Sequence, residues 1–307
     1  MNWSEKTVLL TGGNGFLGKS VLKQLENKEI KKLIIPSSED ADLRKKDICE
    51  KILHEVDLVI HLAGKGGGIE FMRENPADIF YDNLIMSTHL MHEAKQANVE
   101  KFLALGTVCS YPKFSSIPFN ENEMWDGYPE ETNAAYGLSK KMMIVQSDAY
   151  RQQYGFNSIN IIPTNLYGPN DDFNPKTSHV IPGIIMKIQK AINEGSKEIT
   201  LWGDGTPTRD FLYVDDAARG IILAMEGYNE SVPVNLGSMT EISINDIAGK
   251  ISKIMRFDGE IKWDASKPNG QPRRCVGNNN AEKKFGFKSE INIDEGLKNT
   301  IEWFYSQ

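Results

Sequence analysis

Near its start the chain reads Thr7-Val8-Leu9-Leu10-Thr11-Gly12-Gly13-Asn14-Gly15-Phe16-Leu17-Gly18-Lys19-Ser20. The first four residues form a short apolar run that is typical of a buried parallel strand. Regularly spaced glycines follow, and a helical pattern begins directly after them. Glycines let the backbone turn tightly and approach a phosphate, while the helix N-terminus offers N–H donors and a positive dipole end. The stretch therefore predicts a strand, a nucleotide-binding loop and a helix.

The same letters fit two nucleotide-binding motifs. Gly12-x-x-Gly15-x-x-Gly18 is the turn of an extended dinucleotide site, whereas Gly13 through Ser20 satisfies the P-loop pattern of ATPases and kinases. A P-loop protein needs a later apolar strand that ends in a magnesium-binding Asp. The next apolar strand, 57–64, ends instead in small residues, which leave room for a nucleotide. We therefore favour a dinucleotide site and keep a P-loop protein as the alternative.

Strand and helix patterns alternate along the first half of the chain. Apolar runs recur at 32–35, 57–64, 101–106 and 158–163, and a helical period of three and four runs from 76 to 99. Such alternation predicts an α/β fold with a doubly wound parallel sheet, that is, a Rossmann fold.

The second half of the chain has a different character. Residues 170–179 are polar and turn-rich, helices are expected at 188–200 and 211–225, and 234–237 is expected to be a last strand of the sheet. The tail adds an amphipathic helix and a loop at 267–274. We predict a dinucleotide-binding domain formed by residues 1–165 plus about 211–239. A smaller α/β substrate domain is expected at about 166–210 plus 240–307.

Composition excludes several classes of protein. The 307 residues include 35 basic and 42 acidic ones, and a net charge of −7 argues against a nucleic-acid binder. Three scattered cysteines, Cys49, Cys109 and Cys275, make no disulfide framework, and no Cys or His spacing suggests a metal site. No apolar run approaches the length that a signal peptide core or a membrane span needs. We therefore expect a cytoplasmic protein with no metal and no membrane contact.

The end of the second strand bears on the choice of cofactor. NAD sites usually place a carboxylate there to bind the adenosine ribose, but this strand ends in Pro36-Ser37-Ser38. Hydroxyls tolerate a 2′-phosphate, so NADP(H) is predicted over NAD(H), although residues 39–40 are acidic. The counter-charge for the phosphate could come from Lys31, Lys32 or Arg44.

Tyr136 and Lys140 stand four residues apart at the start of a helical segment, so both side chains share one helix face. An ammonium beside a phenol favours the phenolate, so we expect a lowered pKa for Tyr136. Such a tyrosine can exchange a proton with a carbonyl or an alkoxide. Because this spacing is common by chance, a solvated helix face is the alternative.

Thr107 and Cys109 follow directly after the strand at 101–106. In open α/β sheets ligands bind at the carboxyl ends of the strands, so this hydroxyl and this thiol are placed for chemistry. A buried structural cysteine is the alternative for Cys109.

Together these residues resemble the extended short-chain dehydrogenase/reductases that act on nucleotide sugars. The matching motifs are Thr11-Gly12-x-x-Gly15-x-x-Gly18, His61-Leu62-Ala63, Thr107 and Tyr136-x-x-x-Lys140. Further segments, at 109–113, 163–169, 172–173, 178–182 and 267–273, resemble the GDP-L-fucose synthases of that family. The resemblance implies an NADPH-dependent 3,5-epimerase/4-reductase of GDP-4-keto-6-deoxy-mannose that forms a homodimer. A reductase without epimerisation and an NAD-retaining 4-epimerase remain alternatives.

The resemblance also implies a role for each site residue. Cys109 would act as base and His179 as acid in epimerisation, Tyr136 would protonate the alkoxide formed at C4, Lys140 would tune Tyr136, and Thr107 would bind the C4 oxygen. Cofactor contacts are implied for Gly12, Asn14, Gly15, Phe16, Leu17, Ser37, Asp42, Leu43, Leu62, Ala63, Gly64, Tyr136, Lys140, Pro163, Asn165, Leu166 and His179. Substrate contacts are implied for Thr107, Cys109, Asn165, His179, Lys187, Trp202, Arg209, Lys267 and Arg273.

Three departures from the family pattern concern the sugar more than the mechanism. Thr107 stands where Ser is usual, which keeps the hydroxyl but narrows the pocket. Gly64 replaces a common Ala, and Gly-Leu-Ser separates Tyr136 from Lys140 where the fucose synthases have other residues.

Overall fold

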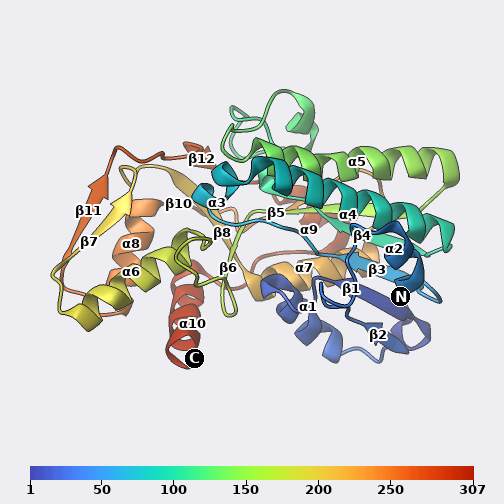
Figure 1. Ribbon diagram of the computed structural model, residues 1–307, viewed down its shortest axis with the longest axis horizontal. Helices are drawn as coiled ribbons and strands as arrows, with labels where there is room; N and C mark the ends of the chain where they lie inside the picture. The colour runs from blue at the N-terminus through green and yellow to red at the C-terminus, as the bar shows by residue number, and fades with distance from the viewer.

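The computed structural model describes all 307 residues and centres on a six-stranded parallel sheet (Figure 1). Its strands lie in the order β2-β1-β3-β4-β5-β9, and every neighbouring pair is parallel. This confirms the predicted doubly wound sheet. The strands are β1 (Thr7–Thr11), β2 (Lys32–Ile34), β3 (Leu58–His61), β4 (Lys101–Leu105), β5 (Ser158–Pro163) and β9 (Val234–Leu236).

Helices cover both faces of this sheet because its strands are apolar on both sides. Alternate residues of β1 divide between two cores: Val8 and Leu10 pack with the helices α1 (Phe16–Glu26) and α7 (Val214–Gly227). Leu9 belongs to the opposite core, which includes residues of α2 (Lys46–Ile52), α4 (Pro76–Gln96) and α5 (Ala134–Tyr154). Figure 1 shows α4 and α5 side by side on one face and α1 and α7 on the other.

The second half of the chain builds two smaller sheets around a separate core of 16 buried residues. The strand β8 (Thr208–Tyr213) pairs with β10 (Glu241–Ser243), β12 (Arg273–Arg274) and β6 (Asn165–Tyr167), while β7 (Glu198–Trp202) pairs with β11 (Glu260–Asp264). The helices α6 (Val180–Glu194), α8 (Ile244–Ile254) and α10 (Ile293–Tyr305) contribute to that core, whereas α9 (Asn279–Phe285) packs with α7 in the first one.

The remaining elements are short. The helix α3 (Ile69–Glu74) precedes α4, and three 3₁₀ turns form at η1 (Trp3–Glu5), η2 (Val108–Ser110) and η3 (Glu121–Trp125). None of the helices combines the length and the apolar character that crossing a bilayer requires.

The predicted bounds of two helices are wrong. The helix expected at 188–200 is α6, which already begins at Val180, directly after His179. It ends at Glu194 because Gly195 adopts the left-handed conformation (φ 66°) that commonly terminates helices, and β7 follows. The helix expected from 211 begins only at Val214, since Phe211, Leu212 and Tyr213 are buried in β8.

Gly18 packs so closely on the glycine loop that no side chain fits. A Cβ at Gly18 would lie 2.1 Å from the carbonyl oxygen of Gly12. We expect Gly18→Ala to lower the free energy of unfolding by about 1–3 kcal/mol, the usual cost of overpacking. The matched control is Gly249→Ala in α8, where a Cβ meets nothing within 4 Å. This variant should raise the free energy of unfolding by up to ~1 kcal/mol, because alanine favours the helix over glycine. Urea unfolding that gave the two variants equal shifts would contradict this prediction.

Candidate active site

The glycine loop rests on the carboxyl end of β3. Gly12 adopts a φ of 73°, and a Cβ there would lie 2.8 Å from the amide nitrogen of Ala63. The amides of Leu62 and Ala63 donate to the carbonyl and the hydroxyl of Thr11, at 3.1 and 3.4 Å. In the strand order 2-1-3 the connections reverse between β1 and β3, and this is where such sheets bind nucleotides. The backbone cradle fits a dinucleotide at Gly12, Gly15 and Ala63.

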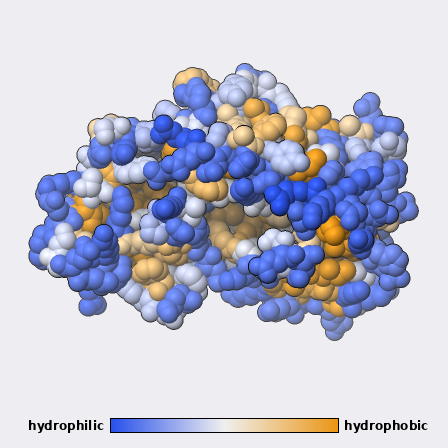
Figure 2. All heavy atoms as spheres, in the orientation of Figure 1, coloured by the Kyte–Doolittle hydropathy of each residue, from blue (hydrophilic) through white to orange (hydrophobic).

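The loop after β3 brings the predicted catalytic residues together. A Cβ on Gly64 would lie 3.0 Å from Nζ of Lys140, and one on Gly66 would lie 3.8 Å from the ring of Tyr136. Gly68 donates its N–H to the carbonyl of Thr177 at 2.7 Å. His179 lies two residues beyond Thr177, so this loop links the His179 segment to Tyr136. Figure 2 shows the surface hollowed between α3 and β6, in the middle of the molecule.

Lys140 is almost fully buried, with 2% of its surface exposed. Its ammonium donates to the carbonyl of Ala63 at 3.1 Å. Burial lowers the pKa of Lys140 to about 8. A buried ammonium at this edge of the sheet is available to hydroxyl groups of a ligand.

Tyr136 does not have the lowered pKa expected from its spacing to Lys140. Burial raises the pKa of Tyr136 well above its ordinary value, the neighbouring Cys109 adds to the rise, and a hydrogen bond with Thr107 opposes it. The expectation failed because Lys140 gives its hydrogen bond to Ala63. The phenol is therefore protonated at neutral pH, which is the form that a proton donor requires.

Close packing between η2 and α5 holds Cys109 beside Tyr136. The amide of Cys109 donates to Oγ1 of Thr107 at 3.2 Å, and a Cβ on Gly137 would lie 2.1 Å from the carbonyl oxygen of Cys109. Oγ of Ser110 donates to the carbonyl of Gly137 at 2.8 Å. Helix and turn therefore fix a hydroxyl, a thiol and a phenol at one strand end.

His179 precedes the first turn of α6. His179 is exposed, yet the surrounding protein removes much of the hydration of its ring and lowers its pKa below the ordinary value, while Asp172 opposes the shift. A neutral imidazole therefore predominates near neutral pH.

Arg209 on β8 is a further predicted substrate residue, and its charge interacts with Cys109. Burial lowers the pKa of Arg209 to about 9, the charge of Arg274 lowers it further, and Cys109 opposes the shift. Asn165 on β6 donates to the carbonyl of Asp210 at 2.9 Å, so it lies against the same strand.

The other predicted substrate residues contact partners within the second half of the chain. Nζ of Lys187 donates to the carbonyl of Thr200 at 2.7 Å. Nζ of Lys267 lies 5.1 Å above the ring of the exposed Trp202. Arg273 forms an ion pair with Glu241, with Nε to Oε1 at 2.8 Å.

Polar side chains that follow β2 in the chain already form hydrogen bonds or ion pairs with one another. Oγ of Ser37 donates to Asp40 at 2.6 Å, and Arg44 binds Asp42 at 2.8 Å and Asp82 at 3.2 Å. The remaining predicted cofactor residues differ in exposure and in position. Asn14 is exposed and Leu43 is buried, while Phe16, Leu17, Leu62, Pro163 and Leu166 line the carboxyl ends of the strands or the start of α1.

Comparison with known proteins places the chain in a family. The model of the NAD dependent epimerase/dehydratase family matches residues 8–237. The chain belongs to this family. It is 36% identical to a probable GDP-L-fucose synthase 1 of Oryza sativa subsp. japonica over 97% of this chain and 91% of that protein. It is 33% identical to the GDP-L-fucose synthase of Escherichia coli K12, over 98% and 97% of the two chains.

Solved structures agree with this placement. A GDP-L-fucose synthetase from Naegleria fowleri superposes with a TM-score of 0.89 at 29% identity, covering 100% of this chain and 95% of that one. A GDP-6-OMe-4-keto-L-xylo-heptose reductase from C. jejuni superposes with a TM-score of 0.92, covering 99% of each chain, and at 22% identity it supports the fold alone.

Membership of the epimerase/dehydratase family rules out the P-loop alternative. Lys19, the lysine of the apparent P-loop, is exposed, and its Nζ donates to Oδ1 of Asn170 at 3.2 Å. The apolar strand β3 ends at His61, where a P-loop protein would carry a magnesium-binding Asp.

Two residues that shape the site, Asn83 and Arg274, were not predicted from the sequence. Asn83 on α4 accepts from the amide of Lys65 at 2.9 Å and donates to its carbonyl at 2.8 Å, so it clamps the loop after β3. Arg274 lies in the register opposite Arg209 on β12. A polar residue on the buried face of an amphipathic helix could have drawn attention to Asn83.

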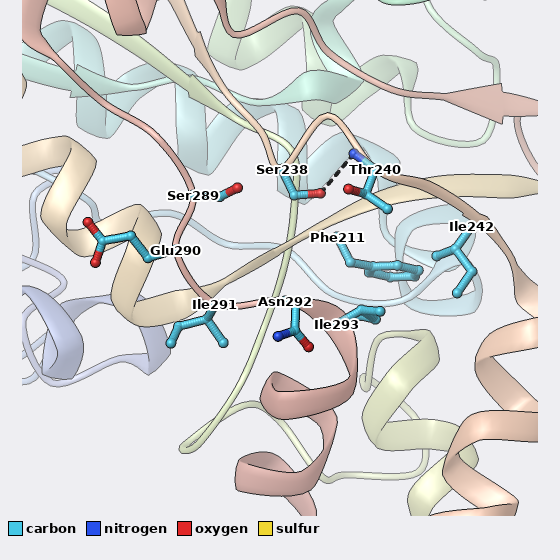
Figure 3. Close-up of a pocket in the computed structure, with 9 residues that line it drawn as sticks. All are labelled: Phe211, Ser238, Thr240, Ile242, Ser289, Glu290, Ile291, Asn292 and Ile293. Carbon is cyan, nitrogen blue, oxygen red and sulfur yellow. Dashed lines mark hydrogen bonds between the residues drawn. The ribbon is translucent and has the colours of Figure 1, made fainter.

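Another hollow lies away from the catalytic group (Figure 3). Oγ of Ser238, on its rim, accepts from the amide of Thr240 at 3.1 Å and donates to Asp210 at 2.6 Å. None of the predicted site residues lines it. Its lining consists of Phe211, Ser238, Thr240, Ile242, Ser289, Glu290, Ile291, Asn292 and Ile293.

Proposed function

We propose that this chain converts GDP-4-keto-6-deoxy-mannose to GDP-L-fucose by 3,5-epimerisation followed by NADPH-dependent reduction at C4. The observation that carries the proposal is the packing of Thr107, Cys109 and Tyr136 at one strand end beside Lys140. The near full-length identity of 33–36% to GDP-L-fucose synthases supports the same substrate. The enzyme is an NADP-dependent oxidoreductase and epimerase of nucleotide sugars.

Epimerisation uses the acidity that a ketone gives to its neighbours. The C4 carbonyl acidifies the protons on C3 and C5, so each centre inverts when one group removes a proton and another returns one on the opposite face. The Cys109 thiolate takes the proton and His179 returns one. Because the neutral form of His179 predominates, each return of a proton follows an uptake from solvent or from a neighbouring group.

Reduction of the C4 ketone follows epimerisation at C3 and C5. NADPH, when bound, supplies the hydride that reduces C4. Thr107 holds the C4 oxygen through its hydroxyl, and Tyr136 transfers its phenolic proton to that oxygen as charge develops there. The raised pKa of Tyr136 keeps this proton available throughout the neutral range. Lys140 holds the cofactor ribose through the ammonium that lies beside Gly64.

Cofactor binding and substrate binding are assigned to two different domains. We propose that residues 1–165 with about 211–239 bind NADP(H), and that about 166–210 with 240–307 bind the sugar nucleotide. The grouping of α7 with α1 in one core and of β6 with α6 and α10 in another supports this division. The strand β8 contributes to both cores through Leu212 and Phe211, so it joins the two units.

We further propose that the enzyme is a cytoplasmic homodimer. Its three cysteines are free thiols, as a reducing compartment would keep them. The outer side of the α4–α5 pair carries exposed apolar side chains, among them Tyr81 at 60% and Val145 at 46% exposure. Two such pairs packed together would form a four-helix bundle.

The dimer is tested by placing a charge on α5. Val145→Glu is expected to give a monomer, because a carboxylate buried in an apolar interface loses its hydration. Light scattering after size-exclusion chromatography measures the mass. Val232→Glu, at 45% exposure before β9, is the control and should remain a dimer. A dimeric Val145→Glu protein would contradict the proposed interface.

The function is tested by incubating the enzyme with NADPH and GDP-4-keto-6-deoxy-mannose. Loss of NADPH absorbance with formation of GDP-L-fucose, identified by NMR, is expected. Oxidation with unchanged C3 and C5 would indicate a reductase that does not epimerise. One relative, 33% identical over 98% of this chain, is a GDP-L-colitose synthase of Yersinia pseudotuberculosis, so the ketosugar precursor of GDP-L-colitose is the second substrate to test.

A further inference from the structure

His61 is a fully buried histidine to which the proposed mechanism gives no role. It ends β3 and is paired in register with Thr11 of β1 and Ala104 of β4. Its Nδ1 lies 2.7 Å from Oγ1 of Thr11, and its Nε2 lies 3.1 Å from Oγ of Ser87 on α4. Both hydroxyl groups belong to buried residues. The ring therefore connects the strand before the glycine loop to α4.

The buried imidazole of His61 is neutral and can satisfy both hydroxyl groups. Burial lowers the pKa of His61 well below its ordinary value, and the charge of Lys140 lowers it further. A neutral imidazole has one N–H donor and one acceptor nitrogen. In either tautomer, therefore, one hydroxyl donates to the ring and the other accepts from it. An apolar side chain at this position would leave both hydroxyls buried without this partner, which is unfavourable.

The hydroxyl of Thr11 extends the pairing between β1 and β3 by one residue. The last backbone bond between the two strands runs from the amide of Leu62 to the carbonyl of Thr11, at 3.1 Å. The next amide, that of Ala63, donates to Oγ1 of Thr11 at 3.4 Å instead. Because His61 bonds to the same oxygen, it fixes the direction of the hydroxyl that Ala63 meets. His61 thereby acts on the start of the loop after β3.

Ala63 continues this chain of contacts to Lys140. Its carbonyl accepts from the buried ammonium of Lys140 at 3.1 Å. At the next residue, Gly64, a Cβ would lie 3.0 Å from the same Nζ and 3.2 Å from Oδ1 of Asn83. Asn83 belongs to α4, the helix that also supplies the second hydroxyl partner of His61. The position of the ammonium therefore depends on contacts that begin at His61.

We propose that His61 is a positioning residue for the nicotinamide half of the cofactor site. Acting through Ala63, it holds the Lys140 ammonium where the cofactor ribose binds. This inference rests on the proposed function for the role of Lys140. The glycine loop depends on His61 less, because it closes on itself through the amide of Gly15, which donates to the carbonyl of Gly12 at 3.0 Å. Loss of His61 should therefore weaken binding of the whole cofactor more than binding of its adenosine half.

The proposal is tested by titrating the full-length protein with NADPH, followed by fluorescence, and with 2′,5′-ADP, the adenosine half alone, followed by calorimetry. His61→Leu is expected to bind NADPH about tenfold more weakly, the effect of one hydrogen bond to a charged group, and 2′,5′-ADP with nearly unchanged affinity. His61→Gln, whose carboxamide donates and accepts, should retain most of the NADPH affinity. His54→Leu replaces an exposed histidine after α2 and is the matched control, which should bind both ligands like the wild type.

Three results would overturn the proposal. The first is unchanged NADPH affinity of His61→Leu. The second is an equal loss of affinity for 2′,5′-ADP, which would indicate a purely structural role. The third is a His61→Gln variant that binds NADPH as weakly as His61→Leu does.

A double variant keeps the test conclusive if His61→Leu does not fold. Thr11→Val combined with His61→Leu replaces two hydrogen-bonded partners by apolar groups, which can leave stability nearly unchanged. The amide of Ala63 still loses its partner, so the NADPH affinity should again fall about tenfold. Wild-type affinity of the double variant would contradict the proposal. Because these titrations contain no ketosugar, a different sugar specificity of the enzyme would leave their results unchanged.

Discussion

Tyr136→Phe is expected to lower the rate of C4 reduction by about a hundredfold to ten-thousandfold, the usual contribution of a positioned general acid. The variant loses the phenolic proton that lies next to Thr107, since the phenol hydrogen-bonds to that residue. A phenylalanine keeps the ring that packs beside Gly66. The cradle at Gly12 and Ala63 is untouched, so the affinity for NADPH should stay close to that of the wild type.

The measurement follows NADPH oxidation with the ketosugar in excess, together with NADPH titration by fluorescence. Tyr154→Phe removes a hydroxyl from the exposed end of the same helix and is the matched control. Exchange of the C3 and C5 protons with deuterated solvent should continue in Tyr136→Phe, because Cys109 and His179 remain. Reduction by Tyr136→Phe at the rate of the control would remove Tyr136 from the mechanism.

The architecture of the first half was predictable because its signals are local. A glycine loop between an apolar strand and a helix, followed by alternating strands, already implies a parallel sheet, and the structure confirms it. The second half was harder because its strands are short and join partners far apart in sequence. Phe211 to Tyr213 forms a strand only because residues 165–167 lie beside it.

Within the site, spacing predicted neighbours better than it predicted energetics. Tyr136 and Lys140 share the helix face that the spacing implied, and both lie near the loop after β3. The direction of the Tyr136 pKa shift was wrong because burial and the partner chosen by Lys140 depend on the whole fold. Arg274 escaped notice for a similar reason, since its place opposite Arg209 follows from pairing between distant strands.

Cys109→Ser is expected to slow proton exchange at C3 and C5 by about a hundredfold to ten-thousandfold while NADPH-dependent reduction continues. A serine hydroxyl has nearly the same shape as the thiol but ionises far less readily, so it is a poor base for a carbon acid. The backbone of residue 109 still bonds to Thr107 and packs on Gly137, so Tyr136 keeps its place. The ketone should then be reduced without inversion.

Slowed proton exchange with continued reduction would distinguish a catalytic role of Cys109 from a structural one. A variant that was merely misfolded would lose exchange and reduction together, so the ratio of the two rates serves as an internal control. Deuterium incorporation measured by NMR in heavy water reports the first rate, NADPH oxidation reports the second, and the configuration of the product identifies what was reduced. A fully epimerised product formed at the wild-type rate would show that another group removes the protons, and His179, with its neutral imidazole, would then be the base to examine.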